Sequence, residues 1–368
     1  MPDGILVGCD LHEKSLLLKI ARGRAASAKR SWRNTPEDWD KMLADLRRRA
    51  AGATIVFAYE ASALGFGLYD FLTGAGVETY VLAPTKIAKS PRERRTKCDE
   101  KDAERLLDLL RGHVLAGNAL PDVWIPDPQT REDREVVRAR LDLSVKAVRV
   151  KAQAKMLLKR NGLRRPEGLG KGWTLAYRAW LRGLAGKKSA LVYGARVALA
   201  SLVRQLASLE KELKALDREI EALSRTERYA ETARRMVEEG HVGLFTAMVM
   251  LTELGDLRRF TNRKQLGAFL GLTPSSHETG EDSDRKGHIT HQGPWRVRRA
   301  LCQMVWTLLR TDPEEKAYYE RVVAKNPKKK MIAVVACMRR LAVRLWHLGL
   351  EAQRDAGVFE GRAVRRAG

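Results

Sequence analysis

Four acidic side chains in the first third of the chain stand where strands end or a helix begins. Asp10 ends one apolar run, and Glu60 follows another by two residues. Asp99 and Asp102 are three residues apart at the start of a charged helical pattern, so they share one helix face. A carboxylate at a strand end in an α/β domain points into the crevice at the edge of the sheet. The four side chains can therefore converge on one or two divalent cations, and we expect Mg²⁺ as the cofactor.

Each acidic residue taken alone has an ordinary structural explanation. Asp99 and Asp102 could favour the dipole of their helix, and Asp10 could cap a turn. The ordered set is more informative, because Asp10 and Glu60 follow strands that are otherwise too apolar for acidic residues.

Strands that alternate with helices must position these carboxylates. The pattern predicts a mixed α/β domain over the first 115 residues. Its expected strands are 5–9, 15–21, 54–58 and 77–82, and its expected helices are 36–49, 64–72 and 101–111.

Beyond a proline-containing linker at 117–130, the chain is predicted to be almost entirely helical. Leucine or isoleucine recurs from Leu202 to Leu223 with spacings of four and three, which predicts a coiled coil. Its partner is either another subunit, which we favour, or the basic helix around 131–160. Residues 163–188 are expected to form a loop or a short helical insert. Gly240 and Gly243 form a Gly-x-x-Gly turn between helices, which either approaches a phosphate or simply connects the two helices.

The composition favours a nucleic-acid partner. The 368 residues include 69 lysines and arginines against 45 acidic residues, for a net charge of +24. Such an excess attracts polyanions, although a basic soluble protein without that function remains the alternative. A hydrophobic content of 44% is enough for a buried core, and the length predicts two or three domains.

The cysteines and the hydropathy indicate a cytoplasmic protein. The four cysteines form no CxxC pair and no zinc-like spacing with histidine, as expected in a reducing compartment. We expect no signal peptide, because acidic residues interrupt the start of the chain, and no membrane helix, because no apolar run approaches ~18 residues.

Two segments carry a resemblance to a known family. Lys97-Cys-Asp-Glu-Lys-Asp-Ala103 resembles the Lys-Thr-Asp-x-x-Asp-Ala signature of the DEDD transposases of the insertion-sequence one-ten family, which includes the Piv invertases. Leu270-Gly-Leu-Thr-Pro-Ser-Ser-His-Glu-Thr-Gly280 is similar to the family's Gly-Leu-x-Pro segment and the Ser-Gly pair that follows it. The resemblance implies an RNase H-like (RuvC-like) catalytic domain at 1–120, a linker and helical coiled-coil region at 121–235, and a helical C-terminal transposase domain at 236–368.

The resemblance also implies a hydroxyl nucleophile in the C-terminal domain. The family uses serine, and the matching position here is Thr279. Threonine keeps the hydroxyl but adds a methyl group that restricts χ1. Ser275, Ser276 and Ser283 are the alternatives if the loop is aligned differently.

Basic residues lie close in sequence to both the acidic residues and the candidate hydroxyl nucleophiles. Arg94, Arg95 and Lys97 precede the acidic pair, and Lys286 opens a basic loop that the family also has. Arginines at the start of the next helix suit phosphate binding, with an exposed basic face as the alternative explanation; they are Arg296, Arg298 and Arg299.

The leading hypothesis is a prokaryotic DNA recombinase or transposase that cuts and rejoins strands through a covalent protein–DNA intermediate. The resemblance implies a guide (bridge) RNA, donor and target DNA, and a homodimer or homotetramer. The alternatives are a RuvC-like metal-dependent endonuclease that uses water, and a non-enzymatic nucleic-acid-binding scaffold.

Overall fold

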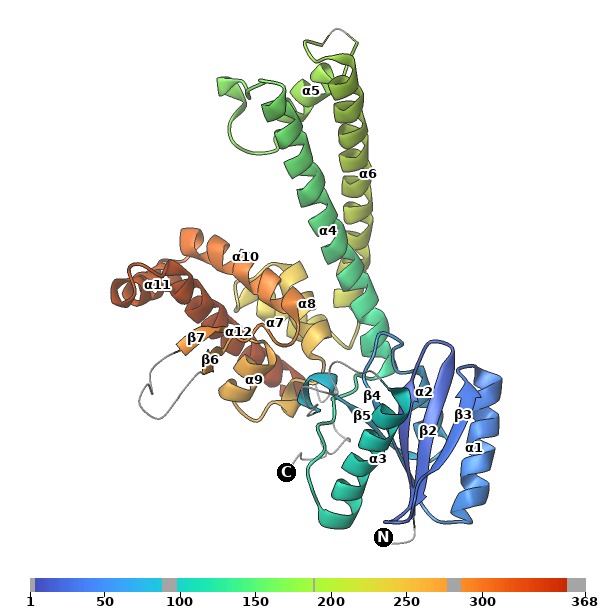
Figure 1. Ribbon diagram of the computed structural model, residues 1–368. Coiled ribbons are helices and arrows are strands. Elements are labelled where there is room, and N and C mark those ends of the chain that lie inside the picture. The colour runs from blue at the N-terminus through green and yellow to red at the C-terminus, as the bar shows by residue number, and fades with distance from the viewer. Residues whose placement is uncertain (1–3, 88–97, 188, 277–285, 356–368) are drawn as a thin grey trace. The chain divides into compact units, whose positions relative to one another are not determined.

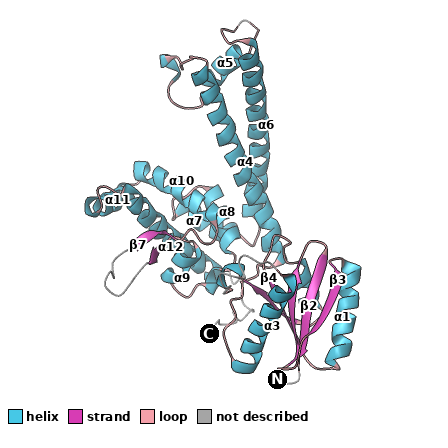
Figure 2. Ribbon diagram, viewed as in Figure 1, coloured by secondary structure: helices cyan, strands magenta, loops and turns pink. Residues whose placement is uncertain are grey.

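The structure is a computed structural model that describes residues 4–87, 98–187, 189–276 and 286–355. It divides into two compact units, with the boundary between Ile125 and Pro126. The first unit is built on a mixed sheet and the second is mostly helical (Figures 1 and 2). This confirms the order of an α/β domain followed by helices; the further boundary that we placed near residue 235 stays a prediction.

The first unit contains a five-stranded sheet in the order β3-β2-β1-β4-β5. β1, β2 and β3 form an antiparallel meander, and β4 and β5 run parallel to β1. β3 was missed by the sequence analysis because an edge strand pairs on one side only and its residues are mostly exposed, so it lacks an apolar run. The strands are β1 (Ile5–Leu11), β2 (Ser15–Arg22), β3 (Ala28–Arg33), β4 (Ile55–Glu60) and β5 (Glu78–Leu82).

Helices cover both faces of this sheet. α1 (Pro36–Ala50) and α2 (Gly67–Gly74) pack on one face, where Cys9 and Phe57 are buried. α3 (Asp99–Ala116) packs on the other face, with Leu6 and Ala58 in its core. The sheet is therefore the middle layer of three, and consecutive residues of β1 and β4 alternate between the two cores.

The expected linker at 117–130 is partly built into the first unit. The amide of Ala83 donates to Pro121 O, and the amide of Val123 donates to Val81 O, each at 2.8 Å. These bonds attach the segment to the end of β5. Pro128 then occupies the first turn of α4, whose N-cap is Asp127.

In the second unit, α4 (Pro128–Arg160) and α6 (Tyr193–Ser224) pack along each other, and α5 (Leu175–Leu184) packs on α6 (Figure 1). We call these three helices the arm. Nε of Arg140, in the first half of α4, lies 2.7 Å from Oδ1 of Asp217, in the second half of α6, whereas Ala154 in the second half of α4 shares a core with Leu199 in the first half of α6. The two long helices are therefore antiparallel.

The heptad seam of α6 faces α4 of the same chain. Leu206 is buried against Ala147 and Val150, with Leu209 and Leu213 packed beside it. This corrects the pairing between subunits that we favoured, because the apolar seam already has a partner within the chain. The coiled-coil geometry itself stays a prediction. α5 and the short 3₁₀ turn Glu167–Leu169 form the helical insert expected at 163–188.

The remaining helices share one large core that also includes Val137 of α4 and Ile220 of α6. They are joined by the 3₁₀ turn Leu257–Arg259 and a short β-hairpin. None of the described helices combines the length and apolarity that crossing a lipid bilayer requires. The elements are α7 (Ala230–Glu238), α8 (Leu244–Leu254), α9 (Arg263–Phe269), β6 (Pro274–Ser276), β7 (Lys286–Ile289), α10 (Trp295–Thr311), α11 (Pro313–Lys325) and α12 (Lys330–Asp355).

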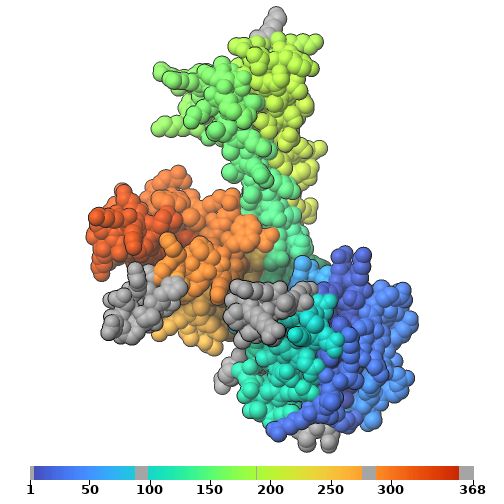
Figure 3. All heavy atoms as spheres, viewed as in Figure 1, coloured from blue at the N-terminus to red at the C-terminus, as the bar shows by residue number. Residues whose placement is uncertain are grey.

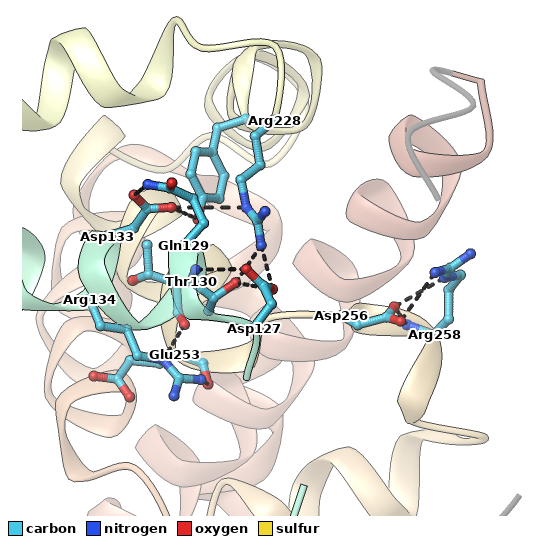
Figure 4. Close-up of polar contacts among 11 residues, drawn as sticks. Asp127, Gln129, Thr130, Asp133, Arg134, Arg228, Glu253, Asp256 and Arg258 are labelled. Carbon is cyan, nitrogen blue, oxygen red and sulfur yellow. Dashed lines mark hydrogen bonds and ion pairs between the residues drawn. The ribbon is translucent and has the colours of Figure 1, made fainter. Parts of the chain in front are cut away.

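Buried polar contacts attach the base of the arm to this core, among them those of Asp133 and Arg134 (Figure 4). Arg138 donates two hydrogen bonds, at 2.7 and 2.9 Å, to the carboxylate of Glu253, which is only 6% exposed. Arg134 donates to the backbone carbonyls of Thr252 and Glu253. The hydroxyl of Tyr229 donates to the buried carboxylate of Asp133 at 2.6 Å. The base of the arm and the C-terminal helices therefore form one packed body.

Candidate metal centre at the ends of β1 and β4

Asp10 and Glu60 occupy matching positions on neighbouring parallel strands. Cys9 of β1 pairs with Tyr59 of β4, so each acidic residue is the next one along its strand. Side chains alternate along a strand, and Ala58 lies in the core beneath α3. Asp10 and Glu60 therefore lie on the α3 face of the sheet, at its carboxyl edge.

Gly8 lets α3 approach this edge closely. A Cβ atom at Gly8 would lie 2.3 Å from Ala103 O and 2.4 Å from Leu107 N, so only glycine fits there. The backbone of α3 thus rests directly on β1. As a result, the first turn of α3, which begins at Asp99, lies over the end of the strand that carries Asp10.

Ion pairs hold the same turn of α3 onto β2 and β3. Lys19 Nζ lies 2.7 Å from Glu100 Oε1 and 3.5 Å from Glu104 Oε2. Lys29 Nζ lies 2.9 Å from Glu100 Oε2. Hydrogen bonds from Lys19 and Lys29 lower the pKa of Glu100 to about 2, so this carboxylate stays charged and bound.

Asp10, His12 and Asp99 form a cluster that could hold a metal ion. His12 Nε2 lies 3.1 Å from Asp10 Oδ2 and 3.3 Å from Asp99 Oδ2, and one ligand atom from each residue lies within 4.8 Å of the others. The side chains are 17%, 33% and 46% exposed for Asp10, His12 and Asp99, so water or a phosphate oxygen has access. Two carboxylates and an imidazole fit a divalent cation, and imidazole suits Mn²⁺ or Zn²⁺ better than Mg²⁺.

Glu60 and Asp102 are not members of this cluster. Glu60 ends β4 on the same face of the sheet. Asp102 is one turn after Asp99 on α3, and its Oδ1 accepts a hydrogen bond from Arg105 at 2.8 Å. The structure therefore brings Asp10 and Asp99 together through a third residue, His12. The participation of Glu60 and Asp102 in a metal site stays a prediction.

His12 was missed by the sequence analysis. The available signal was the spacing Asp10-x-His12, because residues two apart in an extended strand project to the same side. The neighbouring Cys9 is a free, buried cysteine. Burial, with a further contribution from Asp10, raises the pKa of its thiol, so Cys9 stays protonated in the apolar core.

The predicted nucleophile Thr279 lies outside the described residues, as do Ser283, Arg94, Arg95 and Lys97. The flanking strands β6 and β7 form an antiparallel hairpin that contains Ser276 and Lys286. Ser275 Oγ donates a hydrogen bond to His288 O at 3.1 Å, which links β6 to β7.

Arg298 is engaged by the protein backbone. Its Nη1 donates to the carbonyl oxygens of Leu270, Gln292 and Gly293, and its Nη2 donates to His291 O, at 2.8–3.2 Å. One guanidinium thus joins the turn before β6 to the turn before α10. A Cβ at Gly293, where φ is +76°, would lie 1.9 Å from Phe269 O, so these two turns meet backbone to backbone.

Arg296 and Arg299 have fewer protein contacts. Arg296 Nη2 lies 3.6 Å from Asp142 Oδ2 of the arm, and its guanidinium lies over the ring of Trp295. The Nε of Arg299 is buried with no hydrogen-bond partner in the described part of the chain. Phosphate binding by these arginines and by Lys286 stays a prediction.

Sequence comparison matches both ends of the chain. Residues 7–161 match the IS110-type DEDD transposase family, and residues 241–320 match the transposase IS116/IS110/IS902 family. The chain is 29% identical over 324 residues to y4qE of Sinorhizobium fredii, a protein named as a candidate transposase, covering 81% of this chain and 76% of that protein. It is also 36% identical over 73 residues to the transposase for insertion sequence element IS1328 of Yersinia enterocolitica, covering 20% of this chain and 22% of that protein.

The acidic edge of the sheet lies within the first matched segment, and β6, β7 and α10 lie within the second. The protein is therefore a DNA transposase of the DEDD type, a class that depends on divalent metal. The chain belongs to the IS110 family of insertion-sequence transposases.

Proposed function

We propose that this transposase cuts and rejoins DNA with Mg²⁺ held by Asp10, Glu60, Asp99 and Asp102, through a covalent bond between DNA and Thr279. The observation that supports the metal site is that His12 lies close to both Asp99 on α3 and Asp10 on β1. The order β3-β2-β1-β4-β5, with one antiparallel meander and two parallel strands, supports an RNase H-like fold for this unit.

The bound cation would stabilise the charge that develops on the phosphate. Thr279 Oγ would form a new bond to phosphorus while a P–O bond of the DNA strand breaks. The proton leaves Oγ, and the departing nucleoside oxygen takes up a proton. The phosphodiester energy is kept in the protein–DNA ester, so the reverse attack by a new strand end rejoins the DNA without ATP.

A suicide substrate that cannot be rejoined tests the covalent step. We expect the wild type and T279S to form a protein–DNA adduct, which peptide mapping places at residue 279. T279V, which keeps the shape without the hydroxyl, should form none. D10N should abolish cleavage, whereas D108N, on the exposed side of α3, should leave it intact.

The main alternative is a RuvC-like endonuclease in which water is the nucleophile. The open side of the metal cluster, where Asp99 is 46% exposed, gives water the access that this reaction needs. Cleavage by the wild type with divalent metal and no adduct would replace our proposal with this one. An adduct on Ser275, Ser276 or Ser283 would keep the mechanism and change the nucleophile.

We further propose that a bridge RNA guides the reaction and that the protein acts in the cytoplasm as a homodimer or homotetramer. The net charge of +24 supports an additional polyanionic partner, and membership of the IS110 family supports the rest. RNA that copurifies with the protein should map to the DNA flanking its reading frame. Purified protein that is monomeric by mass photometry, with and without that RNA, would contradict the assembly.

A further inference from the structure

The positive charge of the protein is concentrated at the distal part of the arm. Residues 143–209 contain 15 lysines and arginines and a single acidic residue, Glu167. This segment therefore carries +14 of the net charge of +24. The proximal part of the two long helices, residues 128–142 and 210–224, contains seven basic and nine acidic residues. The charge changes from slightly negative to strongly positive along the arm, so a general excess of arginine in the chain does not explain the basic distal segment.

The basic side chains at the distal part are available to a ligand. Lys151 and Arg178 pair with Glu210, the first acidic residue after the segment. Within the described chain, five further basic residues of α4 have no carboxylate within ion-pair distance, and all five are exposed: Lys146, Arg149, Lys155, Lys159 and Arg160. In the space-filling view, the distal arm stands clear of the C-terminal helices (Figure 3).

A hollow of about 570 Å³ lies between α4 and α6 in this region. Arg149 and Arg160 line it from α4, together with Gln153 and Met156, and Ser201 lines it from α6. Met156 is 53% exposed. Two arginines with polar donors between them form a surface on which a phosphate backbone can lie.

We propose that the distal arm is a second DNA-binding surface, which holds duplex DNA by its phosphate backbone away from the metal centre. The proposal rests on the identity of the protein as a DNA transposase, and not on the covalent mechanism or the guide RNA.

The dimensions of the arm favour contact with the backbone over base recognition. A B-DNA major groove about 12 Å wide admits one α-helix of 10–12 Å diameter, so a packed pair of helices does not enter it. From Lys146 to Arg160, α4 rises about 21 Å, which matches about six base pairs of duplex and their two rows of phosphates. Binding by this surface is therefore independent of sequence and sensitive to salt.

Fluorescence anisotropy in EDTA tests the proposal without cleavage. The probes are a 30-base-pair duplex, one of its strands alone and a structured RNA. The test variant is R149Q/K155Q/K159Q/R160Q. The control variant R24Q/R30Q/R47Q/R48Q removes the same charge from exposed positions of the first unit.

For the duplex, we expect the test variant to lose at least about tenfold in affinity near 100 mM salt. Its slope of log K against log salt should fall by about 3 to 4, because each lost phosphate contact contributes about 0.9. The control should change affinity less than about threefold. Unchanged duplex binding, or a loss confined to the RNA or to the single strand, would overturn the proposal.

Lysine acetylation of the wild type provides a test that does not depend on how the variant folds. Duplex DNA should protect Lys155 and Lys159 from acetylation while Lys41, on α1, stays reactive. Equal reactivity of all three lysines with and without saturating duplex would also overturn the proposal. The binding assay in EDTA involves neither cleavage nor bound metal, so failure of the metal mechanism and failure of the arm surface are distinguishable.

Discussion

The imidazole Nε2 of His12 lies 3.3 Å from a carboxylate oxygen of Asp99, and the two residues come from distant parts of the chain. The same nitrogen lies 3.1 Å from Asp10. His12 thus occupies the position where a cation shared by the two carboxylates would gain a nitrogen ligand.

Replacing His12 should change which metal the site prefers. We expect H12A to weaken Mn²⁺ binding by about tenfold and Mg²⁺ binding much less, because Mg²⁺ rarely uses nitrogen ligands. Calorimetric titration of each metal measures the difference. H113A, at the other end of α3, serves as the control. Equal Mn²⁺ affinity of H12A and the wild type would remove His12 from the metal site.

Adding one methyl group at Gly8 should displace α3. In G8A, the new Cβ meets backbone atoms of Ala103 and Leu107, which cannot rotate away. We expect a loss of about 1–3 kcal/mol in the free energy of unfolding, together with loss of metal binding. G74A is the matched control, since nothing lies within 4 Å of its Cβ. Denaturant unfolding and metal titration of both variants check this, and a stable G8A with normal metal affinity would contradict it.

Arg298 should contribute more to the stability of the fold than to DNA binding. In R298A, four backbone carbonyls lose their donor, and we expect a cost of about 1–3 kcal/mol. R296A loses a long ion pair to Asp142 and a contact with the ring of Trp295, and it should cost less than about 1 kcal/mol. Thermal unfolding compares the two variants. A role limited to phosphate contact predicts instead that R298A keeps its stability and loses DNA affinity.

The ion pair between Arg138 and Glu253, at the base of the arm, should contribute more to the free energy of unfolding than an exposed ion pair does. In E253A, the partly buried guanidinium of Arg138 keeps only a 4.0 Å contact to Glu135, so we expect a loss of about 3 kcal/mol. D217A removes the more exposed partner of Arg140 and should cost about 0–1 kcal/mol. Chemical denaturation measures both values, and similar costs for the two variants would contradict the burial argument.

The pairing of Glu100 with Lys19 and Lys29 makes stability depend on pH. The pKa of Glu100 is lowered from 4.5 to about 2 in the folded protein. The contribution of the charged Glu100 carboxylate to stability is therefore present above its unfolded pKa near 4.5, and it is lost as the pH falls toward 2. We expect the gap in Tm between the wild type and E100Q to be constant from pH 6 to 8 and to narrow below pH 4. A gap that does not change down to pH 3 would show that this pairing is not formed.

The local sequence was enough to predict the elements that carry the acids. Apolar runs of five to seven residues predicted four of the five strands of the sheet, since buried strands need continuous apolar side chains. The same runs made Asp10 and Glu60 conspicuous as charges at strand ends. The segment 97–103 indicated the family, which the comparisons confirmed. β3 was not predicted, because an exposed edge strand has no apolar run.

Tertiary structure decided which side chains meet. Only the close packing of α3 on Gly8 brings Asp99 to Asp10 and His12, and leaves Asp102 paired with Arg105. Distances between residues far apart in the chain depend on that packing, which no local pattern encodes. The partner of the α6 seam was undecided for the same reason, because a heptad repeat defines an apolar stripe and not the surface that covers it. The sequence by itself thus determined the class of protein, and the fold determined which of its acidic residues stand together.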